Sequence, residues 1–408
     1  MRALFTVQPS TGHLHPLVPV ARALSAAGHE VAICSAASFR REVEGFGLTH
    51  IDAGLDWLAS DHSTWVSFPP MPPPGPAFGA FVVTVFAEIT TRQMVPDLLV
   101  IARDWKPDLI IREGMEYGGC LAAECLGIPH VSVGGNGYSA VDSPDLHYFP
   151  GNSRLVAEPM ARHRKQFGLP PDPDNLMPFR YLHLCFMPPA WDGDGAPRPR
   201  NTQFLRHVNA IRPNESLPEW VHGRPNRPTV LASLGTVFNT TPGILETIIE
   251  GLAQEPVNLV VSIGSDQNPA RFGPMPPNVR LERYVPQPLL LPHCAVFVTH
   301  AGFNSVKESM IAGIPMVAIP ITADQPYCAG RCAALGVAEV IAPDRRKPDV
   351  VRAATLRVLG NSSYRANAIA FQRRMLALPG HDRMVELLEG LLPQALYHPR
   401  MRVAGDIA

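Results

Sequence analysis

The stretch Thr299-His300-Ala301-Gly302-Phe303-Asn304-Ser305-Val306-Lys307-Glu308-Ser309 decides the fold, because it joins a buried strand to a helix through a glycine-containing turn. The apolar run before it ends at His300, and the helix is expected to begin at about Asn304. Free backbone N–H groups and the positive end of the helix dipole then meet at one point. Such a point suits a diphosphate, and the His300, Asn304 and Ser305 side chains can add donors there.

Glu308 lies one helical turn beyond Asn304 and therefore on the same face of the predicted helix. A diphosphate would repel its carboxylate, so Glu308 is expected to point past the phosphates and accept hydrogen bonds from ribose hydroxyls. The alternative is that Asn304 and Ser305 only cap the helix and that Glu308 is a solvated acid of its first turn. For an isolated strand-turn-helix, this second interpretation is the simpler one.

Strand and helix signals alternate on both sides of this stretch. In the second half, strands are expected at 229–233, 257–263, 295–299, 315–320 and 338–341, with helices at 242–254, 304–312, 324–335 and over most of 348–392. In the first part, strands are expected at 2–7, 30–34, 49–52, 108–111 and 129–133, with helices at 16–27, 39–46 and 117–126. Such alternation predicts an α/β chain with two doubly wound, Rossmann-like domains that face each other across a cleft.

Domain boundaries are expected where this alternation breaks. The chain of 408 residues is too long for one ordinary core. Residues 142–228 are rich in Pro, Asn and Asp and show only brief strand-like pieces such as 180–186. We therefore expect a first domain over 1–210, a linker over 211–228 and a second domain over 229–380. A helix at 381–395 is expected to pack back on the first domain.

The composition argues against several kinds of partner. The formal net charge is −1, which gives no electrostatic reason to expect nucleic acid or an anionic membrane. The seven cysteines show no CxxC spacing, the N-terminus has no signal-peptide layout, and the longest apolar runs are too short to span a bilayer. These features predict a soluble, cytoplasmic protein. No cofactor or metal is implied, because Asp172-Pro173-Asp174 and Asp192-Gly193-Asp194 lie in Pro- or Gly-rich loops and are interpreted as solvated turns.

Two short motifs flank the opening stretch, Tyr284-Val285-Pro286-Gln287 before it and Ala323-Asp324-Gln325 after it. The block from Tyr284 to Gln325 resembles, without a gap, the nucleotide-sugar signature of glycosyltransferase family 1. This family has the GT-B fold and holds plant secondary-product and bacterial antibiotic glycosyltransferases. The resemblance extends more weakly over most of the chain. It implies that the first domain binds the acceptor and the second binds the nucleotide sugar.

The resemblance also implies a role for each matching residue. Tyr284 stands at the position that stacks on the pyrimidine, where many relatives have Trp, and Val285 meets the base edge through its backbone. The other expected contacts are the ribose for Gln287 and Glu308, the diphosphate for His300, Gly302, Asn304, Ser305 and Thr236, and the sugar for Asp324 and Gln325. A ribose diol held by Gln287 and Glu308 favours UDP slightly, and TDP stays open.

A second turn carries the candidate catalytic base. The first strand leads into Gly12-His13-Leu14-His15-Pro16, which is neither a dinucleotide fingerprint nor a P-loop. A histidine in this turn can act as a general base, because the unperturbed imidazole pKa of about 6.5 is near working pH. Taken alone, His13 would more often be a capping or packing residue, and His15 is a rival. The family pattern Gly-His-x-x-Pro implies that His13 is the base.

A carboxylate is expected beside this base, to fix its tautomer and stabilise the imidazolium. The family places an Asp after the strand that precedes the turn Leu126-Gly127-Ile128-Pro129, and counting back from the turn puts Glu113 there. Glu is one methylene longer than the family's Asp, and Glu116 is a nearby alternative. A plain surface acid is the competing interpretation for either residue.

The implied chemistry is an inverting displacement, without a metal or a covalent intermediate, in which the nucleoside diphosphate leaves toward His300 and the helix start. The proline-rich stretch 68–76 is either a packed surface loop or a wall of an apolar cleft. If it is a cleft wall, the acceptor is expected to be a small apolar natural product. Its accepting atom, oxygen or nitrogen, is open. Two alternatives are a nucleotide-sugar epimerase, in which His13 would have no acceptor to activate, and a catalytically silent homologue that binds nucleotide or assists a partner enzyme.

Overall fold

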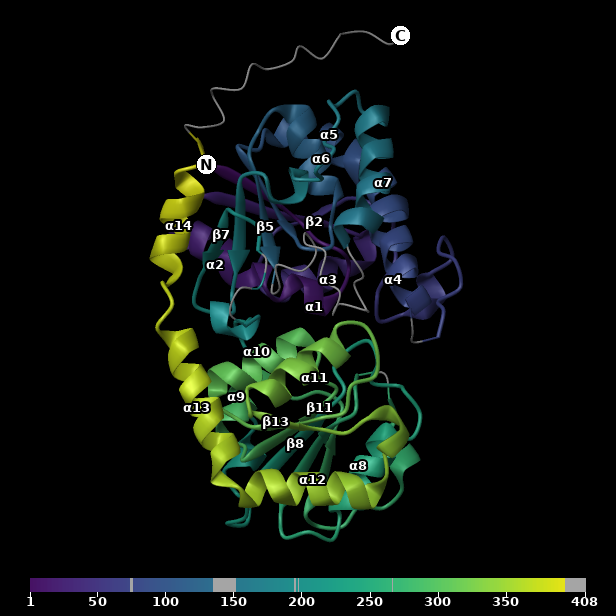
Figure 1. Ribbon diagram of the computed structural model, residues 1–408, viewed down its shortest axis with the longest axis vertical. Coiled ribbons are helices and arrows are strands. Elements are labelled where there is room, and N and C mark those ends of the chain that lie inside the picture. The colour runs from purple at the N-terminus through teal and green to yellow at the C-terminus, as the bar shows by residue number, and fades with distance from the viewer. Residues whose placement is uncertain (74–75, 135–151, 194–195, 197, 266, 393–408) are drawn as a thin grey trace. The chain divides into compact units, whose positions relative to one another are not determined.

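The computed structural model describes the chain except residues 74–75, 135–151, 194–195, 197, 266 and 393–408. The chain divides into two compact units. The first holds Met1–Phe186, Asp194–Arg206 and the chain from Pro379, and the second holds Met187–Gly193 and His207–Leu378. Each unit contains one parallel sheet flanked by helices (Figure 1). The predicted α/β class with two Rossmann-like domains is therefore confirmed.

The sheet of the first unit has the strand order β3-β2-β1-β4-β5-β6-β7, and its neighbouring strands are parallel. The strands are β1 Arg2–Thr6, β2 Glu30–Ser35, β3 His50–Asp52, β4 Leu109–Glu113, β5 His130–Gly134, β6 Leu182–Cys185 and β7 Thr202–Phe204. The central strands β1 and β4 are almost entirely buried, as expected of apolar runs covered on both faces. The loops that follow their carboxyl ends carry the candidate catalytic residues.

Helices cover both faces of this sheet. They are α1 Thr11–Leu14, α2 Leu17–Ala26, α3 Arg40–Glu44, α4 Pro76–Val83, α5 Thr91–Trp105, α6 Gly118–Leu126, α7 Asn152–Gln166 and α14 His381–Glu389. Side chains of α5, α6 and α7, such as Leu98, Leu121 and Val156, share one buried cluster with the strands. The last helix, α14, packs against α2.

Helix α7 overturns one expectation, because residues 142–228 were predicted to contain only brief strands. An interior proline, Pro159, and a polar, basic composition hide its helical period. Even so, Val156, Met160 and His163 recur at intervals of four and three residues, and all three are buried. The prediction of irregular chain is therefore wrong over Asn152–Gln166.

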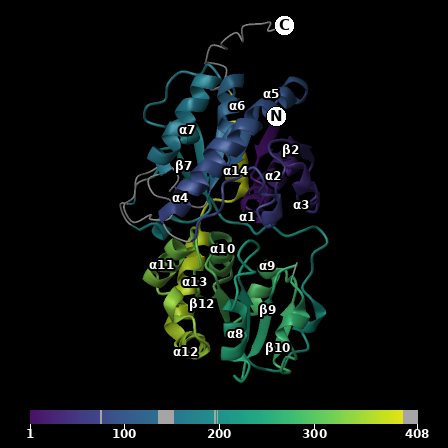
Figure 2. The ribbon, with the colours of Figure 1, turned by 90° about the vertical axis from the view of Figure 1, so that its right-hand side faces the viewer.

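A long helical segment precedes β4, and the sequence analysis did not predict it. It consists of α4, a π-helical stretch Thr84–Thr90 and α5, which follow one another as one long rod in Figure 2. The Phe86 carbonyl accepts hydrogen bonds from Thr90 Oγ1 at 3.0 Å and Thr91 Oγ1 at 2.8 Å. Side-chain donors therefore help to hold the wider π turn, a feature that is frequent at functional sites.

The sheet of the second unit is also parallel, with the order β10-β9-β8-β11-β12-β13. Its strands are β8 Thr229–Ser233, β9 Asn258–Ser262, β10 Val279–Glu282, β11 Val296–Thr299, β12 Met316–Ala318 and β13 Ala338–Val340. Figure 1 shows α8 and α12 on one face, and α9, α10 and α11 on the other, while α13 packs against α10. These helices are α8 Ile244–Leu252, α9 Gln287–Leu290, α10 Phe303–Ala312, α11 Gln325–Ala334, α12 Pro348–Gly360 and α13 Ser362–Leu376.

The short segment Met187–Gly193 belongs to the second unit although β7 of the first unit follows it in the chain. Its anchor is Trp191, whose buried ring lies 5.9 Å from the Phe303 ring and 6.5 Å from the Phe371 ring. The Trp191 carbonyl also accepts a hydrogen bond from Arg331 Nε at 2.6 Å. These contacts draw a short piece of the expected first domain, 1–210, into the second unit.

None of the described helices is both long enough and apolar enough to cross a membrane.

Buried histidines should make the first unit sensitive to acid. Burial, and then the charge of Arg112, lower the pKa of His183 from 6.5 to about 3, and the pKa of His130 well below 6.5 for the same reasons. The unfolded chain therefore takes up protons below about pH 6.5 that the folded chain excludes, so stability is complete above pH 6.5 and falls as the pH is lowered. Each group adds to this loss as the pH falls below 6.5, until its folded pKa is reached. Urea unfolding at pH 7 and pH 5 measures the loss, and His130→Phe should reduce it; an equal loss in both proteins would contradict the expectation.

Candidate active site

The candidate base and its carboxylate meet at the carboxyl edge of the first sheet. His13 lies on α1, directly after β1, and Glu113 is the last residue of β4. His13 Nδ1 is 2.9 Å from Glu113 Oε1, and the two side chains are 27% and 6% exposed. The other carboxylate oxygen of Glu113 accepts the Met115 backbone N–H at 2.7 Å. Nδ1 is thus the ring nitrogen of His13 that faces the carboxylate.

The two rival residues have other surroundings. Glu116 is fully buried and accepts hydrogen bonds from the Thr6 hydroxyl and from the backbone N–H groups of Gly118 (2.6 Å) and Gly119 (2.8 Å). Its carboxylate thus binds the first N–H groups of α6, while burial raises its pKa above the ordinary value. The His15 ring packs edge-on against Phe46, with ring centroids 5.5 Å apart.

Aromatic side chains surround the base. The Phe86 ring, on the π-helical stretch, lies 5.8 Å from the His13 ring and 6.1 Å from Trp57. Trp57 in turn contacts Trp65 and Phe68 edge-on, at 5.7 and 4.9 Å. We call the set the aromatic cluster: Trp57, Trp65, Phe68, Phe78, Phe81 and Phe86. Phe68, the first residue of the proline-rich stretch, therefore packs in this cluster, which continues to the candidate base, whereas Pro69, Pro70 and Met71 are exposed.

The predicted donor residues of the second unit all follow carboxyl ends of strands. Thr236 follows β8, the segment from Tyr284 follows β10, His300 follows β11, and Asp324 follows β12. In an open parallel sheet, this edge is where ligands bind. The structure therefore brings the residues that the sequence singled out to one edge of one sheet.

His300 sits in a tight niche at this edge. The side chain is buried, and burial lowers its pKa to about 4, with a hydrogen bond to the Ser233 backbone opposing the shift. A Cβ added at Gly235 would lie 2.7 Å from His300 Cε1, and one added at Gly302 would overlap His300 Nε2. The two glycines thus make room for an imidazole that is neutral at pH 7.

The start of α10 is connected to the neighbouring loop. Asp324 Oδ2 accepts the backbone N–H of Phe303, the first residue of α10, at 3.0 Å. Both turns contain an alanine with positive φ, Ala301 at 63° and Ala323 at 57°, a conformation that non-glycine residues rarely adopt. Such strain is retained where the surrounding structure demands one backbone shape, commonly at ligand sites.

Glu308 and Ser305 of α10 form a polar group with Gln287 of α9. Gln287 Nε2 donates to Glu308 Oε2 at 2.6 Å and to Ser305 Oγ at 3.4 Å. Burial raises the pKa of Glu308 to about 7, and the Gln287 hydrogen bond opposes this shift. The two residues expected at the ribose therefore lie side by side, with Ser305 in contact with Gln287.

The remaining residues expected to bind the sugar donor differ in how exposed their side chains are. Tyr284 is 59% exposed and donates its hydroxyl to Glu215, whereas Val285 is buried, so only its backbone could meet a base. Thr236 is exposed, and Asn304 is half-buried in the first turn of α10. Gln325 is buried, and its Oε1 accepts the N–H groups of Ile321 (2.7 Å) and Thr322 (3.1 Å). This oxygen holds its own turn, so a sugar contact would fall to the Gln325 amide nitrogen.

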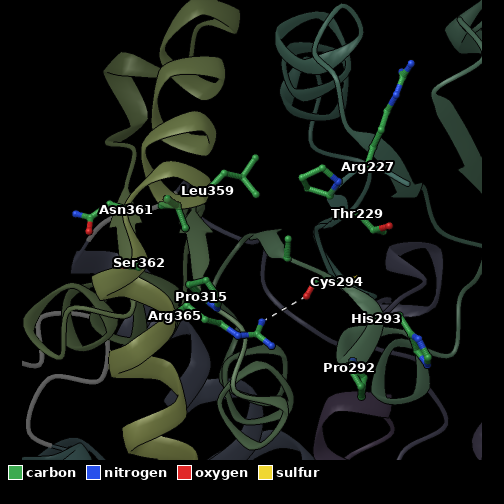
Figure 3. Close-up of a pocket in the computed structure, with 13 residues that line it drawn as sticks. Arg227, Thr229, Pro292, His293, Cys294, Pro315, Leu359, Asn361, Ser362 and Arg365 are labelled. Carbon is green, nitrogen blue, oxygen red and sulfur yellow. Dashed lines mark hydrogen bonds between the residues drawn. The ribbon is translucent and has the colours of Figure 1, made fainter. Parts of the chain in front are cut away.

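Figure 3 shows a pocket of about 440 Å³ at the other edge of this sheet. Thr229, Ala295 and Pro315, which line it, stand at the amino ends of β8, β11 and β12. Arg365 reaches into it and donates to the Cys294 carbonyl at 3.5 Å. The pocket is therefore separate from the loops that carry the donor candidates.

Metal ligation finds no support among the described residues, where no group of three or more His, Cys, Asp or Glu could hold an ion. Asp172 of the first Asp-x-Asp string accepts the Met177 N–H at 2.7 Å and pairs with Arg180 at 3.4 Å. Asp194 of the second string lies outside the described residues.

Sequence reasoning missed two side chains at the catalytic edge, Phe86 and Arg112. Phe86 lies in a continuous apolar run that shows no helical period. Arg112 is a charged residue inside the apolar strand β4, and this contrast was a signal that could have been followed.

Comparisons with known proteins show which family the chain resembles. Residues 79–142 match the family model "Erythromycin biosynthesis protein CIII-like, N-terminal domain", and residues 246–391 match the corresponding C-terminal domain. The chain is 28% identical to 4'-demethylrebeccamycin synthase of Lentzea aerocolonigenes, over 96% of this chain and 99% of that protein. It is 26% identical to 3-alpha-mycarosylerythronolide B desosaminyl transferase of Saccharopolyspora erythraea, over 96% and 98%.

Among solved structures, the glycosyltransferase VinC in complex with dTDP matches with a TM-score of 0.77 and 27% identity, over 97% of this chain and 100% of that one. The SsfS6 glycosyltransferase of Streptomyces sp. SF2575, complexed with thymidine diphosphate, matches with a TM-score of 0.76 and 25% identity, over 96% and 99%. The two family models, the full-length relatives and the shared fold lead to one conclusion. The chain belongs to the bacterial secondary-metabolite glycosyltransferases of the GT-B fold.

Proposed function

We propose that this chain is an inverting, metal-independent glycosyltransferase that moves a sugar from TDP to a hydroxyl group of an apolar natural product. The observation that carries the proposal is the 2.9 Å contact between His13 Nδ1 and Glu113 Oε1, at the sheet edge where ligands bind. In this proposal the first unit binds the acceptor and the second binds the nucleotide sugar.

The reaction begins at His13. Its Nε2 takes the proton of the acceptor hydroxyl while the acceptor oxygen attacks the anomeric carbon. The bond from that carbon to the diphosphate oxygen breaks on the opposite face, so configuration inverts and the electron pair leaves with TDP. Glu113, held by the Met115 N–H, stabilises the imidazolium that forms.

The leaving group is stabilised in the second unit. His300 is neutral at pH 7 and can donate a ring N–H to the diphosphate without bringing a second titrating charge. The first turn of α10 adds backbone N–H groups beyond that of Phe303, which already donates to Asp324. Asp324 thus shapes the phosphate end of the site, and its other carboxylate oxygen is the one proposed to meet the sugar.

We favour TDP over UDP as the nucleotide of the donor, although the sequence alone slightly favours UDP. VinC and SsfS6, which match nearly the whole chain, are complexed with this nucleotide. Its deoxyribose offers one free hydroxyl, and the adjacent Gln287 and Glu308 side chains require no more than one.

The acceptor side is supported by the aromatic cluster. Phe86 is half-buried beside His13, so an acceptor whose hydroxyl reaches Nε2 would lie against this ring. Aromatic faces suit apolar, ring-containing ligands.

Product analysis tests the proposal. The protein is incubated with TDP-sugars and UDP-sugars of known anomeric configuration and a panel of polyketide and indole acceptors. Magnetic resonance then gives the configuration of the new bond. A glycoside of opposite configuration, formed from the TDP donor in the presence of a chelator, is expected. Nucleotide binding without transfer to any acceptor would favour a silent homologue, and a retained configuration would overturn the mechanism.

The affinity for TDP should increase between pH 6 and 8. Burial holds the pKa of free Glu308 at about 7, and a hydrogen bond from the ribose favours its ionised form. Binding then releases a proton, and affinity gains up to about fivefold from pH 6 to pH 7 and about tenfold by pH 8, where it levels off. Calorimetry measures this slope, and Glu308→Gln corrects for ionisation of the diphosphate itself. Equal slopes in both proteins would show that Glu308 does not bind the ribose.

A further inference from the structure

Arg112 is a buried cation that contacts the 113–116 turn, the turn that begins with Glu113. It lies on β4, next to Glu113, and its side chain is fully buried. Nη1 donates to three carbonyls of one turn, those of Glu113 (3.1 Å), Gly114 (3.0 Å) and Glu116 (3.1 Å). Three bonds from one nitrogen to one turn fix the backbone more firmly than packing alone.

The same side chain connects the turn to a second part of the unit. Nη2 donates to the Pro178 carbonyl at 2.7 Å, and the guanidinium carbon lies 5.5 Å from the Tyr117 ring and 5.7 Å from the Phe179 ring. Only a planar guanidinium presents donors in these directions while its faces contact aromatic rings.

The backbone of the 113–116 turn determines where the Glu113 carboxylate lies. The Glu116 N–H closes the turn on the Glu113 carbonyl at 3.2 Å, and the Met115 N–H holds the Glu113 carboxylate at 2.7 Å. A change in the backbone at 113–116 therefore moves the oxygen that lies 2.9 Å from His13. The buried positive charge of Arg112 also opposes the rise in the pKa of Glu116 that burial causes.

We propose that Arg112 is a positioning residue that holds the 113–116 turn so that the Glu113 carboxylate stays against His13. The inference rests on the proposed function in assigning His13 as the base, and the contact itself can be tested without any substrate. Arg112→Lys keeps the charge but loses the guanidinium fork, whereas Arg112→Met loses both. Arg164→Met is the matched control, because Arg164 is also buried in this unit and donates to the Pro170 carbonyl and to Glu124 instead.

The first readout is the titration of His13, followed by magnetic resonance of proteins with 13C-labelled histidine, with His13→Asn assigning the signal. A carboxylate at 2.9 Å favours the protonated imidazole. If Arg112→Lys lets the Glu113 carboxylate move away, the midpoint of the His13 titration should move to lower pH. Arg164→Met should titrate as the wild type does. The proposal is overturned if Arg112→Lys leaves the His13 midpoint unchanged, or if the control shifts it equally.

The second readout is kinetic. A misplaced Glu113 should lower kcat on the order of 10- to 100-fold in Arg112→Lys, with KM for the donor unchanged and the acid limb of the pH profile moved to lower pH. Arg112→Met should lose more, or fail to fold, and Arg164→Met should keep kcat whatever its thermal stability. If wild-type protein transfers no sugar, the proposed function fails, and the His13 titration still decides the role of Arg112.

Discussion

His13→Ala should lower kcat for sugar transfer by about 10²- to 10⁴-fold, the range in which a positioned general base contributes. His13 Nε2 is the atom proposed to take the acceptor proton, and water cannot replace it with the same geometry. Because the acceptor proton is not yet transferred in the ground state, KM for the donor should change little. Initial rates with the acceptor and the TDP-sugar each varied in turn measure kcat and KM for the donor.

His15→Ala is the matched control for this variant. His15 is two residues away on the same turn, and its ring packs against Phe46. It should keep kcat near the wild-type value, while Glu113→Gln, which removes the carboxylate charge but keeps the shape, should fall between the two histidine variants. If His15→Ala lost as much activity as His13→Ala, the turn would be required for its structure and His13 would not be the base.

The fold was predictable wherever burial alone sets the pattern. β1, β4, β8 and β11 are short apolar runs bounded by polar or turn residues, and such runs are read correctly because both faces of the sheet are covered. α7 and the segment Pro76–Trp105 were missed for a physical reason. Interior prolines and, at Thr84–Thr90, a π-helical turn break the 3.6-residue period by which a helix is recognised in a sequence.

The candidate site was predictable to a different degree at its two ends. The turn glycine, Gly302, and the helix start at Phe303 follow from local sequence, so the residues around His300 could be named in advance. The pairing of His13 with Glu113 joins residues that are 100 positions apart, and only the family resemblance pointed to it. The hydrogen bond from Phe303 to Asp324 and the contact of Phe86 with His13 depend on tertiary packing, which no local pattern records.

His300→Ala should lower kcat/KM by about 10²- to 10³-fold, the usual cost of removing one preorganised donor from a developing negative charge. Because burial lowers the pKa of His300 to about 4, the imidazole stays neutral from pH 6 to 8. The fold-loss should therefore be the same across this range, in contrast to the loss in His13→Ala, which should increase with pH as the imidazole becomes the neutral base. Calorimetry with TDP should show weaker binding as well.

Gly302→Ala offers a second approach to the same interaction without removing the imidazole. The added Cβ would overlap His300 Nε2, so the ring must move out of its niche and the activity should approach that of His300→Ala. His293→Ala is the matched control, because His293 lines the pocket at the opposite edge of the same sheet. Should Gly302→Ala retain full activity, the position of the His300 ring would be irrelevant to catalysis. The diphosphate would then be held by the α10 backbone alone, because the N–H groups of that turn do not depend on the imidazole.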